Sequence, residues 1–168
     1  APTLINAAAR VRSWVIPDAA TNAAQGEHRP FGLAYYRGKV YCGVVLSAQN
    51  QDGTNAGTTA DMMGIIYSIN PRVAAPTFTT VTSFPMSYRA EAPWVPWNNR
   101  YYHYGSEKGE GPAQPMITDI VFYKNGEMVL GFTDRSGHQA GWNNDDPAGG
   151  HYPPYGDLGI IQGDVVRL

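Results

Sequence analysis

The chain is predicted to be all-β and of β-propeller type, because one strand-pair motif occurs in it twice. Residues 29–45 and 114–133 each contain a proline, an apolar run, a glycine turn and a second apolar run. In each copy another glycine follows the turn glycine by five residues. These glycines are Gly38, Gly43, Gly126 and Gly131. A hairpin that repeats in this way is typical of a propeller blade or of another repeated β-sheet unit.

The composition agrees with short strands joined by loops. Of the 168 residues, 19 are Gly, 13 are Pro and 11 are Tyr, a mixture of turn formers and strand formers. The net charge is −2 and no basic run exceeds two residues, so the clustered Lys and Arg that bind nucleic acid are missing. The longest apolar stretches reach about eight residues, too short for a membrane-spanning helix. The single cysteine, Cys42, is expected to be a small buried apolar residue.

The first blade is expected to span about residues 29–85, after a short strand at residues 11–16. Its hairpin turns at Arg37–Gly38. A third apolar run is stopped by a proline, and a fourth alternates apolar residues with threonine. The four strands are expected at residues 31–36, 39–46, 62–69 and 77–84.

The second blade is expected to span about residues 115–168 and to be incomplete. Its hairpin turns at Asn125–Gly126, a strong hairpin signal, and no fourth apolar run follows the third. Its strands are expected at residues 117–123, 127–133 and 159–168. Residues 1–168 are therefore a single propeller-like domain or segment of about two four-stranded meanders. Since a propeller needs roughly four to eight blades, the chain is expected to belong to a larger propeller or to an oligomeric ring.

Two long connections, residues 85–115 and 134–158, carry many of the aromatic residues. Exposed aromatic rings stack on sugar rings or anchor protein partners. The alternative is that these rings pack the loops against the blades, because Pro- and Gly-rich loops need a local core. The aromatic ligand-binding candidates are Trp94, Trp97, Tyr101, Tyr104 and Trp142.

The densest polar cluster, residues 133–139, follows a strand end, where propellers place ligand-facing loops. Arg135 and His138 are ligand-binding candidates. Asp134 could bind a metal or act with His138 as an acid and base pair. The structural alternative is that Asp134 pairs with Arg135 or caps backbone amides, while His138 is hydrogen-bonded inside the blade junction.

An oxygen-rich run occupies residues 143–146. Calcium takes oxygen ligands, so this run together with Asp134 forms a candidate calcium site. The spacing is not that of an EF-hand loop. The alternative is a solvated loop. The candidate ligands are Asp134, Asn144, Asp145 and Asp146. No other cofactor is expected.

Seven segments together resemble a known protein family. They are residues 29–33, 39–45, 66–71, 94–97, 114–119, 130–139 and 163–167. In order and spacing they resemble the propeller-like region of large bacterial cell-surface proteins, which often also carry SdrD B-like or other immunoglobulin-like modules. The resemblance covers most of residues 28–168. It implies a secreted, cell-surface protein without assigned catalysis, and it supplies no catalytic residues to carry over.

The sequence therefore predicts a secreted bacterial surface protein that acts as a structural, assembly or binding module and not as an enzyme. Its expected partners are other copies or other chains of the same surface assembly, with a glycan as a further candidate. One alternative is a lectin-like, glycan-binding propeller built from two-blade chains. Another is a propeller hydrolase or lyase, which would need several inward-facing Asp, Glu or His residues from different blades.

Overall fold

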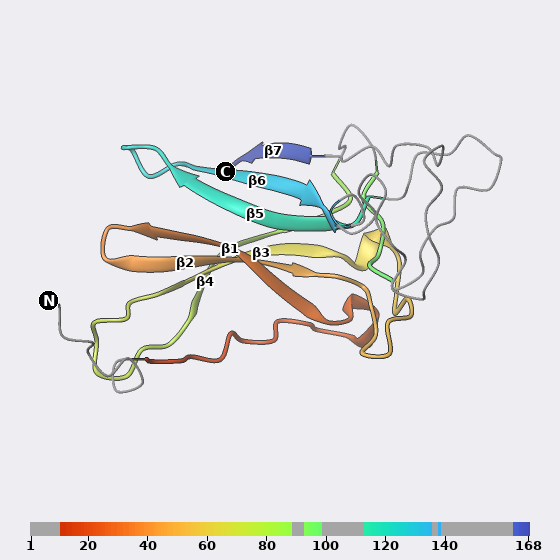
Figure 1. The fold of residues 1–168 in the computed structure, drawn as a ribbon, viewed down its shortest axis with the longest axis horizontal. Coiled ribbons are helices and arrows are strands. Elements are labelled where there is room, and N and C mark those ends of the chain that lie inside the picture. The colour runs from red at the N-terminus through yellow and green to blue at the C-terminus, as the bar shows by residue number, and fades with distance from the viewer. Residues whose placement is uncertain (1–10, 89–92, 99–112, 136–137, 139–162) are drawn as a thin grey trace, which may run out of the picture.

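The structure, a computed structural model, confirms the all-β prediction and contains two antiparallel sheets (Figure 1). It describes residues 11–88, 93–98, 113–135, 138 and 163–168. Besides the strands, the described residues include two short 3₁₀ helices, η2 (Ala23–Gln25) and η3 (Thr59–Asp61). No helix in these ranges is long and apolar enough to cross a membrane.

The two sheets have four and three strands, each paired in chain order. The first sheet contains β1 (His28–Tyr36), β2 (Lys39–Leu46), β3 (Met63–Ile69) and β4 (Thr79–Pro85). The second sheet contains β5 (Pro115–Phe122), β6 (Met128–Asp134) and β7 (Gly163–Arg167). These strands confirm the predicted order of seven, with ends that shift by a few residues. Within the described ranges the two sheets do not close a ring.

Both predicted hairpins are present, and each turn needs its glycine. Arg37 and Gly38 both have positive φ, 45° and 84°, which makes the β1–β2 connection a type I′ turn. The β5–β6 connection is a three-residue loop in which the amide of Gly126 donates to the carbonyl oxygen of Tyr123 at 3.0 Å. Gly126 closes this loop with a φ of 98°, in the left-handed region that favours glycine.

The predicted strand at residues 11–16 is wrong. These residues belong to no strand, and Ile16 packs with Ala19 and Ala20 on the face of the first sheet that points away from the second sheet. A segment that lies across a sheet face meets side chains and finds no strand edge with which to form a ladder. We call residues 11–20 the strap. Val11 and Val15 of the strap are exposed.

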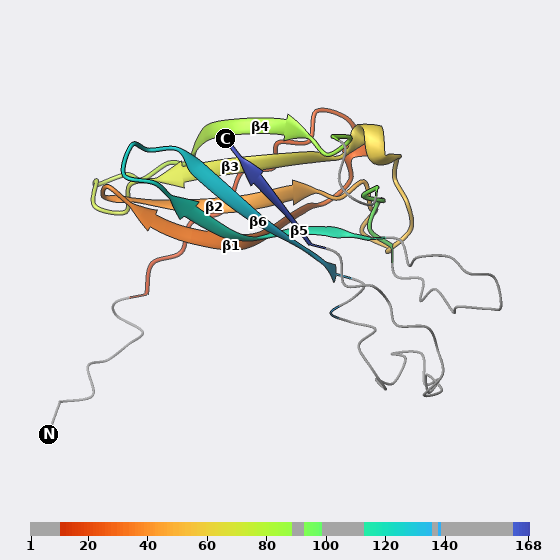
Figure 2. The ribbon, with the colours of Figure 1, turned by 90° about the horizontal axis from the view of Figure 1, so that it is seen from above.

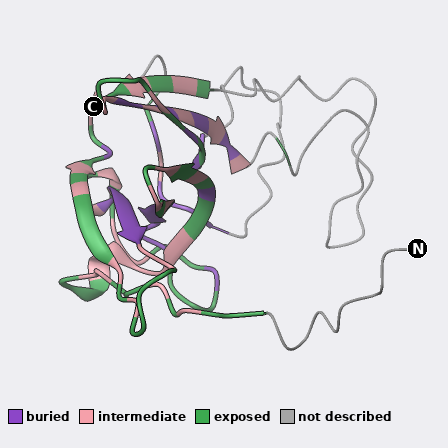
Figure 3. Cartoon of the chain, turned by 90° about the vertical axis from the view of Figure 1, so that its left-hand side faces the viewer, coloured by how far each residue is buried: buried purple, intermediate pink, exposed green. Residues whose placement is uncertain are grey.

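The second sheet lies over one face of the first, with β5 against β1 and β2 (Figures 1 and 2). The core between the sheets is made of apolar side chains from both sheets. Figure 3 shows the buried residues, in purple, in the interior of the molecule. It includes Val45, Ile66, Ile117, Ile120, Leu130 and Phe132. A second apolar cluster lies under the strap and contains Cys42, Val44, Leu46, Ile65 and Tyr67. Burial of this kind, which confirms the prediction for Cys42, raises the pKa of its thiol.

The tips of the two hairpins are joined to each other. The Tyr36 ring stacks on Phe122 with centroids 4.4 Å apart and planes 3° from parallel. The Tyr36 hydroxyl donates to the carbonyl oxygens of Tyr123 and Lys124, at 3.2 and 3.3 Å. The Arg37 guanidinium also donates to the Lys124 carbonyl, at 3.0 Å. These contacts fix one end of the inter-sheet interface.

The three strands of the second sheet repeat the pairing register of the first three strands. Gly43 of β2 lies opposite Ile66 of β3, and Gly131 of β6 lies opposite Val165 of β7. The residue two positions before Ile66 or Val165 is again a glycine in both sheets. We call two positions equivalent when they occupy the same place in this shared register.

Equivalent faces of the two sheets point the same way. Gly43 faces the second sheet, where an added Cβ would lie 2.5 Å from Cγ2 of Ile117. Gly131 faces away from the first sheet, because its neighbours Leu130 and Phe132 are the ones that enter the inter-sheet core. The sheets are therefore stacked head to tail. The front face of the first packs on the back face of the second, and the front face of the second points outward.

Gly43→Ala should destabilise the fold by about 1–3 kcal/mol, because the new methyl group would overpack the core at Ile117. Gly131→Ala is the matched control. Its added Cβ would lie 3.3 Å from Cβ of Asp119, so a change below about 1 kcal/mol is expected. Urea unfolding of both variants measures the difference. Equal losses in the two variants would contradict the close packing assigned to Gly43.

Candidate functional site

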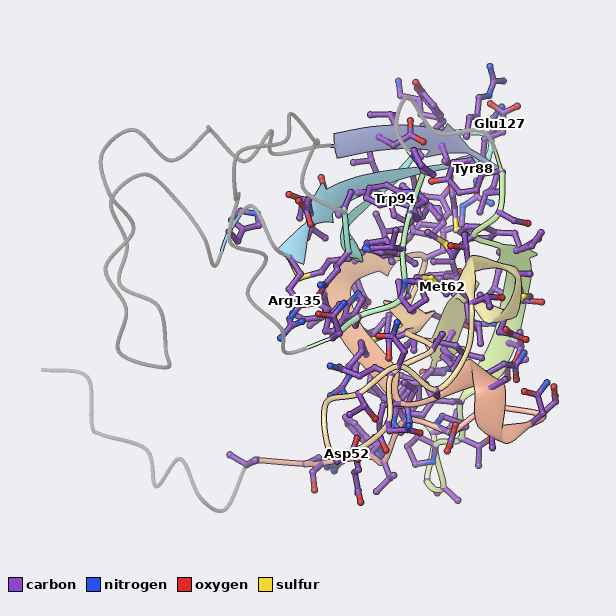
Figure 4. The ribbon with its side chains drawn as sticks, turned by 90° about the vertical axis from the view of Figure 1, so that its right-hand side faces the viewer. Asp52, Met62, Tyr88, Trp94, Glu127 and Arg135 are labelled. Atoms are coloured by element: carbon purple, nitrogen blue, oxygen red, sulfur yellow. The ribbon has the colours of Figure 1, made fainter. Side chains whose placement is uncertain are left out.

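Polar side chains gather where β1 begins and β6 ends, at a group of residues that we call the strand-end junction. Figure 4 shows Arg135 of this group just beyond the end of β6. The group combines residues from both sheets with the segment 93–98. Its members are Arg29, Gln49, Trp97, Asn98, Gln114, Asp134 and Arg135.

Asp134 acts as a backbone cap in this structure. It is the last residue of β6, is 2% exposed and lies opposite Pro115. Since a proline has no amide hydrogen, the ladder cannot continue there through backbone groups alone. The Oδ1 of Asp134 instead accepts from the amide of Gln114 at 2.8 Å, and the amide of Arg135 donates to the Gln114 carbonyl at 2.8 Å. This geometry matches the structural alternative given for Asp134.

Arg135 and Arg29 both lie against the ring of Trp97. Their guanidinium carbons are 4.9 and 5.5 Å from the ring centroid, a cation–π geometry. Arg135 Nη1 also donates to the Asn98 carbonyl at 3.0 Å and to the side chain of Gln114. The charged groups therefore hold the segment 93–98 against the ends of both sheets.

Trp97 connects the two sheets through its own hydrogen bonds. Its backbone amide donates to the carbonyl of Ser47, which follows β2, at 2.9 Å. Its ring Nε1 donates to the carbonyl of Pro115, which begins β5, at 2.9 Å. The side chain is 4% exposed. In this position the ring is packed by Arg29, Arg135 and Phe31 and presents no open face to a ligand.

Trp94 is part of the inter-sheet core. It is 1% exposed, lies 6.0 Å from the ring of Phe132 and donates from Nε1 to the Tyr88 hydroxyl oxygen at 3.0 Å. Figure 4 shows the Tyr88 and Trp94 side chains close together. Burial, and to a smaller extent the carboxylate of Asp164 in β7, raises the pKa of Tyr88. For Trp94 and Trp97 the structure thus gives the packing role that the sequence left as an alternative.

The helix η3 contacts the backbone of Trp94. The hydroxyl of Thr59 donates to the Trp94 carbonyl at 2.8 Å. The Oδ2 of Asp61 accepts from both the amide and the hydroxyl of Thr58, each at 2.9 Å, and closes the first turn of η3. These two hydrogen bonds lower the pKa of Asp61, because they stabilise its charged form.

The remaining site candidates divide into one placed residue and six that lie outside the described residues. His138 is exposed, and its Nε2 is 2.9 Å from the hydroxyl oxygen of Thr133, a hydrogen bond at the end of β6. The residues outside the description are Tyr101, Tyr104, Trp142, Asn144, Asp145 and Asp146. Among the described residues, no group of three His, Cys, Asp or Glu side chains could hold a metal ion.

Sequence reasoning missed Arg29 and Gln114 as members of the junction. Each of them directly precedes a proline, Pro30 or Pro115. The two prolines do not occupy the same place in the shared register, because Pro30 lies opposite Val44 and Pro115 lies opposite Asp134. The repeated proline therefore gave no signal that would bring these two residues together.

Comparison with protein-family models, with curated proteins and with solved structures gives no significant match to this chain.

Asp134→Ala should cost about 1–3 kcal/mol of stability, because it leaves the buried amide of Gln114 without its acceptor. Asp134→Asn keeps an oxygen at the same place and should cost less. Urea unfolding with and without added Ca²⁺ tests this. A stabilisation by Ca²⁺ that the wild type shows and Asp134→Ala loses would instead support the metal-ligand interpretation.

Asp61→Asn should lower the stability at neutral pH and remove one part of the acid sensitivity. The pKa of Asp61 is below its ordinary value of 3.8 in the folded state, so its contribution is present above 3.8 and is lost as the pH falls through the folded value. The difference in unfolding free energy between wild type and variant should therefore shrink in that acid range. A difference that stays constant down to strong acid would contradict the assignment.

Proposed function

We propose that this chain is a propeller-type structural or binding module of a bacterial cell surface, which acts by association and not by turnover. The observation that carries the proposal is the head-to-tail stacking of its two sheets. Ile66 on the front face of the first sheet is 0% exposed, and its equivalent Val165 on the front face of the second sheet is 71% exposed. The chain thus repeats an interface-forming face and leaves one repeat of it open.

Stacking in one orientation favours blades over a closed two-sheet sandwich. A sandwich turns the apolar faces of its two sheets toward each other and is complete with two layers. A propeller repeats one sheet around an axis, so that every blade uses both of its faces. The first strands β1 and β5 lie side by side here, and each carries a bulge at the equivalent place. This arrangement supports the blade interpretation.

The strand-end junction supports a scaffold role. Hydrogen bonds of Gln114 and Arg135 join β5, β6 and the segment 93–98 to one another. Asp134, the candidate for a metal ligand or acid, serves the same purpose. A repeated module needs outer faces of defined shape. Contacts that hold a connecting segment such as 93–98 against the sheet ends help to keep that shape.

The cell-surface part of the proposal depends on the resemblance of residues 28–168 to the propeller-like region of large bacterial surface proteins. The low content of charged residues, 15%, fits the same class. The lectin-like alternative gains nothing from Trp94 and Trp97, because both side chains are buried.

Protease treatment of intact cells that produce the protein, followed by native mass measurement of the extracted material, tests the proposal. The chain should be released from intact cells, and its native assembly should be well above the chain mass of 18.3 kDa. Release only after lysis would contradict the surface location. Turnover of a polysaccharide or peptide substrate by the purified chain would contradict a role without catalysis.

A further inference from the structure

Large apolar side chains are exposed on both outer sheet faces. On the back face of the first sheet, Leu33 is 66% and Tyr35 60% exposed. On the front face of the second sheet, Tyr123 is 53% exposed and Val165 71%. These side chains do not fit the alternation of a sheet whose outer face meets only water, which places polar residues there.

Leu33 and Tyr35 on the back face of the first sheet are equivalent to residues through which the second sheet contacts the first. Leu33 lies opposite Cys42, as Ile120 lies opposite Leu130. Cys42 and Leu130 each precede the repeated glycine, so Leu33 and Ile120 are equivalent. In the same register Tyr35 is equivalent to Phe122, because their partners Val40 and Met128 are equivalent.

The same holds for the front face of the second sheet. Tyr123, which closes the β5–β6 loop, is equivalent to Tyr36, which closes the β1–β2 turn. Val165 is equivalent to Ile66. Gly131 is equivalent to Gly43, and a glycine inside a strand often marks a close approach by another backbone or side chain.

The interface between the two sheets of one chain uses these equivalent residues as its contacts. Phe122 stacks on Tyr36 with centroids 4.4 Å apart. Ile120 and Ile117 lie over Gly43, where an added Cβ would be 3.6 Å from Cδ1 of Ile120 and 2.5 Å from Cγ2 of Ile117. The free faces therefore carry part of a second set of these contacts, with Tyr35 and Leu33 on one face and Tyr123 and Gly131 on the other. The Ile117 contact is not repeated, because its equivalent is Pro30.

We propose that the front face of the second sheet binds the back face of the first sheet of a second copy of this chain. In this contact Tyr35 of one copy stacks on Tyr123 of the next, and Leu33 lies over Gly131. The contact repeats the part of the internal interface in which Phe122 stacks on Tyr36 and Ile120 lies over Gly43. It is heterologous, so it propagates from copy to copy and ends only if the rotation closes a ring. The inference rests on the proposed function and names its partner.

The strap sets the condition for a complete contact. It covers the middle of the back face of the first sheet through Ile16, Ala19 and Ala20, and leaves Leu33 and Tyr35 exposed. Among the described residues, no backbone hydrogen bond links residues 11–20 to the first sheet. An incoming sheet would replace this cover once the strap moves aside, at the cost of side-chain contacts and without breaking a ladder.

Two half-blocked variants of the full chain test the inference. Tyr35→Asp blocks only the first-sheet face, and Tyr123→Asp blocks only the second-sheet face. Both side chains are exposed, so the folds should be retained, which urea unfolding checks. Val73→Asp, at an exposed residue in the β3–β4 connection, is the matched control for an added charge.

Sedimentation velocity over a concentration series gives the outcome. Wild type and Val73→Asp should form species larger than a dimer, and each blocked variant alone should associate at least about tenfold more weakly. A mixture of the two blocked variants should form a two-chain complex and stop there, because each supplies the one face that the other lacks.

Three results would overturn the inference. The first is a wild type that stays monomeric at every concentration, and the second is association that neither blocked variant weakens. The third is a mixture that fails to form the two-chain complex, which is the result expected for an isologous contact. A wild type that is released from intact cells in a large assembly but does not bind itself would overturn the inference and leave the proposed function standing.

Discussion

The close approach of β5 to β1 and β2 is the contact on which the rest of the structure depends. An added Cβ at Gly32 would lie 2.9 Å from the Ile117 carbonyl oxygen, and one at Gly43 would meet the Ile117 side chain. Two glycines in neighbouring strands thus admit one isoleucine of the other sheet. Both first strands carry a bulge at this place, and a bulge bends a strand locally. The core forms around this point, and the hairpin tips and the strand-end junction close its two ends.

The two ends are closed by different chemistry. At the hairpin tips, Tyr36 provides both a stacking surface and a hydroxyl donor, so apolar burial and hydrogen bonding act through one side chain. At the strand-end junction, Pro115 at the start of β5 has no amide hydrogen to give to the backbone ladder. The side chains of Asp134 and Trp97 hydrogen-bond to the backbone of Gln114 and Pro115 there. The polar residues that look most like a site in the sequence are thus needed by the fold itself.

Local signals predicted the parts of the fold that local chemistry decides. The turn glycines Gly38 and Gly126 and the alternating runs on either side of them gave both hairpins nearly residue by residue. The prediction at residues 11–16 was wrong because a strand needs a free edge, and which segment reaches an edge is decided by tertiary packing. The sequence left ligand binding and packing both open for Trp94 and Trp97 for the same reason. Their partners, Phe132, Pro115 and the two arginines, lie far away in the sequence.

A hydrophobic pattern by itself does not tell which of two equivalent faces is a core. Ile66 and Val165 occupy one position of the shared register with similar side chains, yet one is fully buried and the other mostly exposed. Apolar burial contributes about 25 cal/mol per Å², so an exposed face of this kind holds stabilisation that only a further layer can release. Because the front and back faces differ, a further sheet cannot pack front to front and still use the contacts of the inter-sheet interface. The order of faces within one chain therefore already specifies the direction in which an assembly would grow.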